Sequence, residues 1–205
     1  MTNFLSGIKE CVIVQGKAWG ELYFNWESAK QYKIYDSEKK TLGSVIERKG
    51  GFFHTLKRLI FRSHRTLQLE IFDAENKNIA SCERPFFFFL SHMIVKGEEN
   101  KLYGSIHRRV TIFSKKYDLK DSSGNVFARV KAPFWNIWKF PIYDHLGNDI
   151  GEIDNRWSGA LRELFSDADT FYVDLAKVKE NVEHKILLLA LSVAIDFDFF
   201  ENKQR

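Results

Sequence analysis

The sequence is poor in cysteine, with only Cys11 and Cys82 in 205 residues. The two have no paired spacing, and no Cys/His cluster accompanies them, which excludes a disulfide framework and a structural zinc site. A reducing, intracellular location is therefore the default expectation.

Several targeting and charge signals are also missing. Residues 1–7 lack a charged segment followed by a long apolar one, and position 2 is not glycine, so neither a signal peptide nor N-myristoylation is expected. The net charge of +4 is only mildly basic, which fits an anionic membrane surface, and no nucleic-acid partner is expected. We expect a cytoplasmic chain, peripheral at the membrane when it binds lipid.

The residues of conventional catalysis are not arranged for it. The six histidines are scattered, Ser158 lies in a Trp-Ser-Gly sequence and not in a nucleophile elbow, and no phosphate-binding loop occurs. No catalytic residue is therefore assigned.

One apolar run, Ile186 to Ile195, has no polar face, so a helix there must be enclosed by protein or lipid. Crossing a bilayer takes roughly 20 apolar residues, about twice the length of this run before Asp196 and Asp198 interrupt it. Carboxylates among Phe197, Phe199 and Phe200 would need partners in either setting. We expect a helix at about 180–200 buried in protein, with a single-pass membrane anchor as the alternative.

The rest of the chain repeats one pattern, in which alternating apolar residues lead into a turn of Asp, Gly, Asn or Lys and then alternate again. Such a pattern predicts β-hairpins. Five are expected, together with a strand pair around 12–26 and a last strand at 171–175; the hairpins cover residues 32–46, 67–84, 93–106, 117–130 and 141–153.

With 44% hydrophobic and 15% aromatic residues, the chain can fill one sizeable core, so we expect a single domain over 1–205. A closed antiparallel barrel of about twelve strands would remove the sheet edges and enclose the apolar helix. The predicted fold is mainly β, with the hydrophobic C-terminal helix inside the barrel.

Residues in the last quarter of the chain resemble the phospholipid scramblase family of the Tubby-like barrel superfamily. The resemblance implies a twelve-stranded barrel threaded by a hydrophobic helix. The residues that carry it are Glu83-Arg84-Pro85, Gly151, Ile153, Trp157-Ser158-Gly159, Leu161-Arg162-Glu163, Phe165, Asp167-Ala168-Asp169, Phe171, Ile195-Asp196-Phe197 and Phe199-Phe200-Glu201. The long proline-rich N-terminal tail and the cysteine clusters of animal scramblases are not in this sequence, so acyl anchoring is not expected.

The segment Ser166–Asp169 resembles the acidic stretch proposed as the family's calcium site. Asp167 and Asp169, joined by Asp174, are the candidate metal ligands, and calcium is the only cofactor candidate. A helix-loop-helix calcium loop needs more oxygen ligands than these. The alternative is a turn into the last strand whose carboxylates accept backbone hydrogen bonds.

The stretch 50–65 combines apolar residues at helical spacing with cations elsewhere on the helix. This pattern is typical of an interfacial amphipathic helix on an anionic membrane, and equally of a helix or loop packed across the barrel with a solvated basic face. The candidate lipid-binding residues are Phe52, Phe53, Lys57, Arg58, Arg62 and Arg65, with Trp135 and Trp138 from a second segment.

Two aromatic groups leave the same choice open. Phe86 to Phe89 cannot all point inward from one strand, so at least two are either covered by another segment or exposed as a patch. Trp135 and Trp138 suit either a core or a membrane interface.

Two functions follow as hypotheses. The first is a scramblase-family barrel that binds anionic phospholipid peripherally, with lipid scrambling, a translocation and not a chemical reaction, implied by the resemblance. The second is a cytosolic module that binds protein partners or phosphoinositides without scrambling. Neither predicts an oligomeric state.

Overall fold

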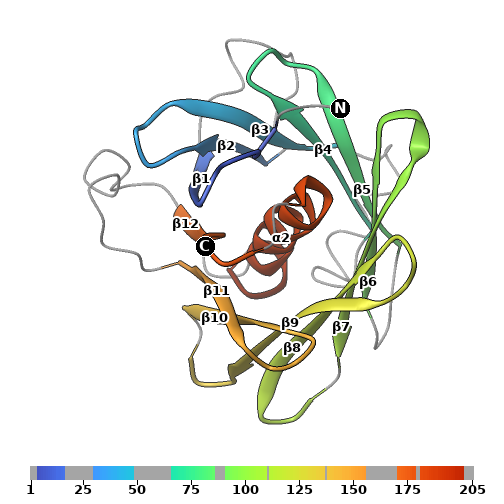
Figure 1. The fold of residues 1–205 in the computed structure, drawn as a ribbon, viewed down its shortest axis with the longest axis vertical. Helices are drawn as coiled ribbons and strands as arrows, with labels where there is room; N and C mark the ends of the chain where they lie inside the picture. Colours follow the sequence, from blue (N-terminus) through green and yellow to red (C-terminus); the bar gives the residue numbers. More distant parts are fainter. Residues whose placement is uncertain are drawn as a thin grey trace, which may run out of the picture.

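A computed structural model describes residues 4–16, 30–48, 66–85, 91–109, 111–136, 138–155, 170–178 and 181–200. Twelve antiparallel strands close into a barrel around one helix, α2, as Figure 1 shows. The strands are β1 (Glu10–Gly16), β2 (Gln31–Tyr35), β3 (Thr41–Glu47), β4 (Leu67–Asp73), β5 (Asn78–Arg84), β6 (His92–Gly97), β7 (Leu102–Arg109), β8 (Ser114–Asp121), β9 (Val126–Pro133), β10 (Lys139–Asp144), β11 (Asp149–Asp154) and β12 (Thr170–Asp174).

Each strand pairs with its neighbours in the chain, and β1 closes the barrel by pairing with both β2 and β12. The mainly β barrel and all five hairpins predicted from the sequence are confirmed. The strand pair expected around 12–26 is described only in part, because β1 ends at Gly16 and residues 17–29 lie outside the described residues.

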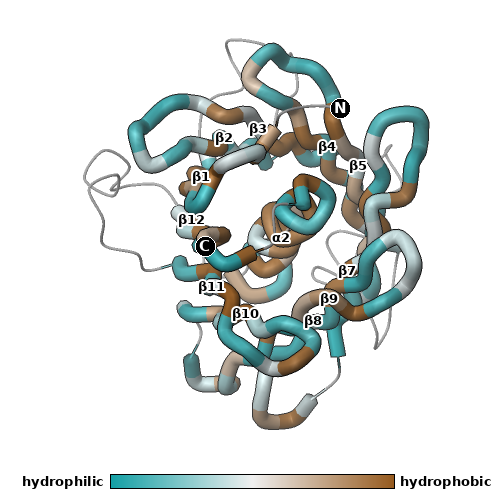
Figure 2. The backbone as a smooth tube through the Cα atoms, viewed as in Figure 1, coloured by the Kyte–Doolittle hydropathy of each residue, from teal (hydrophilic) through white to brown (hydrophobic). Residues whose placement is uncertain are grey.

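The helix α2 runs over Val182–Ile195 and continues into a π-helical turn, Asp196–Phe200. Asn181 caps its first turn, because the side-chain oxygen accepts a hydrogen bond from the His184 amide. Every residue from Lys185 to Ile195 is buried, and Figure 2 shows this apolar helix inside the ring of strands. The prediction of a helix enclosed by protein is confirmed, and no described helix has the length and apolarity to span a membrane.

Alternation along the strands supplies the other half of the core. Residues such as Ile71, Val95 and Leu119 point into the barrel and are fully buried, while their chain neighbours are more exposed. The strand residues and the helix residues form one continuous hydrophobic cluster. The helix, which has no polar face, therefore fills the barrel interior, and the inward-facing strand residues bury the helix.

An antiparallel barrel with this strand order places its connections alternately at two ends. Five connections, β2–β3, β4–β5, β6–β7, β8–β9 and β10–β11, have four or five residues each, and we call this the turn end. The other six, which include connections of up to 19 residues, lie at the opposite end, which we call the loop end. Because α2 starts after β12 at the turn end and runs through the barrel, its C-terminus lies at the loop end.

Four hairpins at the turn end use the same turn. In each, an aspartate at the end of the first strand accepts hydrogen bonds from the amides two and four residues later, and the residue three positions later has a positive φ. The aspartates are Asp36, Asp73, Asp121 and Asp144, and the positive-φ residues are Lys39, Asn76, Gly124 and Gly147.

One glycine of the family resemblance has a steric explanation. Gly151 on β11 has a φ of +150°, and a Cβ there would lie 2.3 Å from the carbonyl oxygen of Asp174. The backbone of β12 approaches β11 so closely at this point that a side chain has no room.

Candidate functional site: the loop end of the barrel

Charged groups are buried at the loop end, where the π-helical turn leaves the barrel. The Asp196 carboxylate accepts hydrogen bonds from Lys30 Nζ at 2.7 Å and from the Tyr32 hydroxyl at 2.6 Å. The Asp198 carboxylate accepts from Arg84 at 2.7 Å and from the Tyr117 hydroxyl at 2.7 Å. We call these two carboxylates and their partners the carboxylate latch.

The latch explains how acidic residues can end an apolar helix. The side chains of Arg84 and Asp198 are each 2% exposed, and Arg108 approaches the second Asp198 oxygen at 3.5 Å. Desolvation, followed by the charge of Asp198, raises the pKa of Tyr117 well above its usual value, so this hydroxyl stays a donor. The partners that these carboxylates need are therefore the strand residues Tyr32, Arg84 and Tyr117 of the barrel wall, together with Lys30, which directly precedes β2.

The outer wall at the same end carries a row of cations. The strand register places Arg109 on β7 opposite Lys116 on β8, and Lys116 opposite Lys131 on β9. Lys116 and Lys131 point away from the core, because their chain neighbours Lys115, Tyr117, Val130 and Ala132 are buried, and Arg109 shares their face because it is paired directly with Lys116. We call Arg109, Lys116 and Lys131 the basic row.

Only one member of the basic row has a carboxylate partner among the described residues. Arg109 pairs with Asp118 at 2.6 Å, whereas neither Lys116 nor Lys131 is in an ion pair there. Like charges directly opposite each other across a strand pair destabilise a sheet. The row is therefore unfavourable for folding and provides positive charge for an anionic surface.

Beyond the basic row lie the most exposed large apolar side chains among the described residues of the loop end. The β7–β8 connection presents Ile112 and Phe113, and the β9–β10 connection presents Phe134 and Trp135; between 64% and 82% of each residue is exposed. A hydrogen bond of 3.1 Å from the Phe134 amide to the Phe113 carbonyl joins the two connections. We call these four residues the apolar tip.

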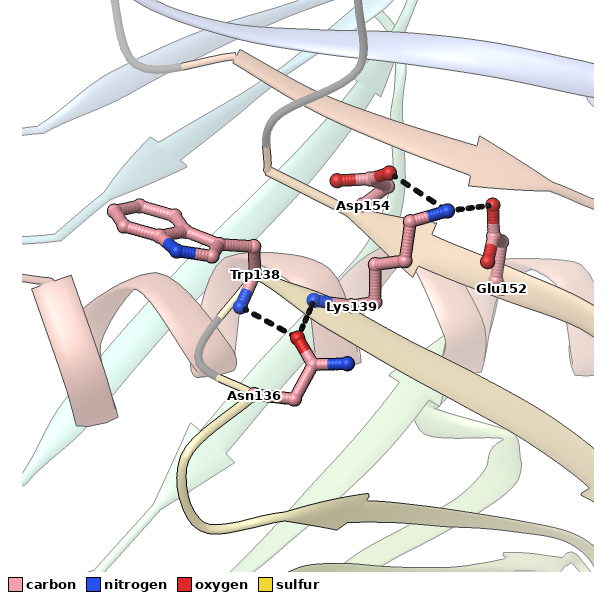
Figure 3. A network of polar contacts seen from close by, with 5 residues as sticks. All are labelled: Asn136, Trp138, Lys139, Glu152 and Asp154. Atoms are coloured by element: carbon pink, nitrogen blue, oxygen red, sulfur yellow. Dashed lines mark hydrogen bonds and ion pairs between the residues drawn. The ribbon is translucent and has the colours of Figure 1, made fainter.

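The backbone fixes this exposure. The Asn136 side chain accepts hydrogen bonds from the amides of Trp138 at 3.4 Å and Lys139 at 3.2 Å, as Figure 3 shows. The backbone amide of Asn136 in turn donates a hydrogen bond to the Pro133 carbonyl at 3.1 Å, which closes a tight turn. Phe134 and Trp135 lie within this turn.

Lys139, next to the tip, does not add to the basic row. Its Nζ lies 3.3 Å from Glu152 and 3.4 Å from Asp154, an arrangement visible in Figure 3. The nearby carboxylates raise the pKa of Lys139, first of all through the hydrogen bond that Lys139 donates to Glu152, so its charge is retained but balanced locally. At the loop end of this wall, Lys116 and Lys131 are the members of the basic row that have no ion pair among the described residues.

Of the residues predicted to bind lipid, the structure describes only Trp135 and Trp138. Trp135 is 78% exposed at the loop end, whereas Trp138 is half-buried and its ring stacks on Phe200 at 5.7 Å between centroids. The other predicted lipid-binding residues lie outside the described residues; they are Phe52, Phe53, Lys57, Arg58, Arg62 and Arg65. Phe86 to Phe89 also lie outside the described residues. Residues 48 and 66, which flank the stretch from Phe52 to Arg65, belong to the loop-end connection between β3 and β4.

The calcium prediction remains a prediction. Asp167 and Asp169 lie outside the described residues, and the described residues contain no cluster of three metal-ligating side chains. Asp174 lies at the turn end of β12, roughly 13 Å along the strand from Thr170, and its carboxylate accepts the Ala176 amide at 2.9 Å.

Sequence reasoning missed the basic row, Ile112 and Phe113, and it did not use Phe134 as a binding residue. The row arises from the pairing of three strands, and no linear pattern of the sequence encodes it. Phe113 and Phe134 become neighbours only through the barrel register. The signal that could have drawn attention to Ile112 and Phe113 is two consecutive large apolar residues in a short connection between polar strands.

Comparison with known proteins places this fold in a family. A family model described as Scramblase matches residues 1–202, so the chain belongs to the scramblase family, and the resemblance stated from the sequence is confirmed.

Two fungal relatives match 90% and 88% of this chain. The chain is 25% identical to the "Altered inheritance rate of mitochondria protein 25" of Saccharomyces cerevisiae, over 90% of this chain and 68% of that protein. It is 21% identical to a phospholipid scramblase family protein of Schizosaccharomyces pombe, of which it covers 56%. A 53-residue stretch is 40% identical to the mouse protein "Phospholipid scramblase 1", over 26% of this chain and 16% of that protein.

A solved Arabidopsis thaliana structure shares the fold. It has a TM-score of 0.51 at 10% sequence identity and covers 91% of this chain and 90% of the plant protein.

Proposed function

We propose that this scramblase-family barrel binds anionic phospholipid membranes peripherally through its loop end. The observation that carries the proposal is the basic row, in which Lys116 and Lys131 lie opposite each other on the outer wall and form no ion pair with the part of the chain that the structure describes. Each cation near an anionic bilayer contributes about 1 kcal/mol of binding free energy, and this contribution is screened by salt. Folding gives no reason for the juxtaposition, and an anionic partner does.

Other residues support the same end of the barrel. The stretch that contains Lys57, Arg58, Arg62 and Arg65 lies in the sequence between β3 and β4, and the described residues 48 and 66 on either side of it are at the loop end. Phospholipid scrambling is the part of the proposal that family membership suggests. Because α2 fills the barrel interior, we expect any lipid transfer to take place at the outer surface of the protein.

The test is flotation of the purified chain with neutral and with anionic vesicles, with and without calcium and over a range of salt concentrations. We expect salt-sensitive, calcium-independent binding to the anionic vesicles. Lys116→Glu with Lys131→Glu should weaken it at least about tenfold, because reversing two charges changes four charge units at the surface. The matched control, Lys39→Glu with Lys40→Glu at the turn end, should bind like the unmodified chain.

Each arm has a contradicting result. Equal binding by the two double variants would remove the basic row from the lipid surface. The absence of binding to any vesicle would overturn the proposed function and favour the module that binds protein partners. If calcium proves necessary, Asp167→Ala with Asp169→Ala tests whether the acidic segment supplies the site.

A further inference from the structure

The apolar tip has a use that the basic row alone does not explain. Large apolar side chains gathered in one exposed patch mark an interaction site more often than isolated exposed ones do. Among the described residues, six large hydrophobic residues are exposed, and four of them form the tip. The other two, Leu102 and Leu146, lie apart in separate hairpins at the turn end.

The choice of occupant follows from charge and position. Three tip residues lie three positions along the chain from a basic-row residue, namely Ile112 from Arg109, Phe113 from Lys116 and Phe134 from Lys131, and Trp135 lies four positions from Lys131. The apolar tip with the basic row behind it matches a bilayer surface, in which hydrocarbon lies beneath anionic head groups. A protein partner would have to offer an apolar groove with anionic groups along its rim.

The composition of the tip fits the same depth profile. Trp and Phe are favoured at the boundary between head groups and acyl chains, and Trp can donate a hydrogen bond there from its ring N–H. The turn closed by Asn136 holds Phe134 and Trp135 outward before any partner arrives. Little conformational freedom is then lost on binding, which favours affinity.

Resting on the proposed function, we infer that the apolar tip, Ile112, Phe113, Phe134 and Trp135, inserts into the acyl boundary of anionic membranes while Lys116 and Lys131 contact the head groups. The barrel then stands with its loop end on the membrane and its turn end in water.

The experiment places an environment-sensitive fluorophore at the tip of the full chain. Phe113→Cys and Leu146→Cys form a matched pair, because both residues are 75% exposed and lie at opposite ends of the barrel. The native Cys11 and Cys82 are buried, and desolvation raises the pKa of each to about 12, so they are not labelled in the folded protein. Mixed neutral and anionic phospholipid vesicles serve as the probe, with and without a quencher attached to the acyl chains.

The label at position 113 should shift to the blue on vesicle binding and be quenched from within the bilayer, while the label at 146 should change in neither respect. In a second arm, Phe113→Ser with Trp135→Ser should weaken vesicle affinity about tenfold or more, because apolar area no longer leaves water on binding. Leu102→Ser with Leu146→Ser should change it less than about twofold. Since all four positions are exposed, every variant should keep the thermal unfolding midpoint of the unmodified chain.

Failure of this inference is distinguishable from failure of the proposed function. One set of results would support the proposed function and overturn insertion: the unmodified chain binds vesicles, charge reversal of the basic row abolishes that binding, and the label at position 113 stays in water. Equal affinity of the two serine double variants would also overturn insertion. If the unmodified chain binds no vesicle, both proposals fall together.

Discussion

The two ends of this barrel are built by different means. At the turn end, four connections repeat one turn in which an aspartate binds two nearby amides, so each connection is determined within five residues of sequence. At the loop end, the ordering contacts join distant parts of the chain, as between Tyr32 and Asp196, which are 164 residues apart. The hairpin turns of one end are therefore formed by local contacts, whereas the carboxylate latch of the other end depends on the closed barrel.

The difference matters for function, because the loop end combines three features that the turn end lacks among the described residues. These are the carboxylate latch, the basic row and the apolar tip. The turn end instead fastens the start of α2, where Lys185 Nζ donates to the carbonyls of Leu5 at 3.1 Å and Ile8 at 3.0 Å. We interpret the turn end as the anchor of the fold and the loop end as its working surface.

The largest effect is expected from breaking the carboxylate latch. Asp198→Ala removes the counter-charge of Arg84, whose side chain is 2% exposed, and it removes the hydrogen-bond acceptor of the Tyr117 hydroxyl. Removing one member of a buried ion pair costs about 3–5 kcal/mol of unfolding free energy. Equilibrium denaturation in urea measures it.

The matched control for the latch is Asp149→Ala. Its carboxylate forms an exposed pair with Lys177 at 3.9 Å, and the substitution should leave the unfolding free energy nearly unchanged. Equal losses in the two variants would show that the latch does not hold the end of α2.

A smaller effect is expected from breaking one turn. Asp121→Ala removes the acceptor for the amides of Ser123 and Asn125 in the β8–β9 connection, at a cost of about 1–2 kcal/mol in the same denaturation experiment. Because the turn is local, vesicle affinity should stay that of the unmodified chain. A loss of vesicle binding with the fold intact would contradict the division between the two ends.

The turn end and the helix could be predicted from the sequence because their determinants are local. Alternation around Asp73 or Asp121 identifies a hairpin, and a run of ten residues with nine apolar ones and a single serine, Ile186 to Ile195, identifies a helix that must be enclosed. The cost of placing carboxylates in an apolar setting also predicted correctly that Asp196 and Asp198 need partners, although not that Lys30, Tyr32, Arg84 and Tyr117 would supply them. Those partners depend on the strand register, which alternation alone does not determine.

The candidate site could be predicted only in part for the same reason. Trp135 was recognised by its residue type, whereas Lys116 and Lys131 became a candidate pair only when the register placed them opposite each other. The residues 50–65 and 166–169, on which the lipid and calcium predictions depended, lie outside the described residues, so these predictions stand untested.

The most direct test of the central claim compares the two ends in one sample, by amide hydrogen exchange of the full chain with and without anionic vesicles. The account predicts slower exchange at residues 111–116 and 131–136 in the presence of vesicles, and unchanged exchange in the turns that follow Asp36, Asp73, Asp121 and Asp144. Slower exchange at those turns, or no difference at 111–116 and 131–136 while the protein is vesicle-bound, would contradict the assignment of the loop end as the membrane surface.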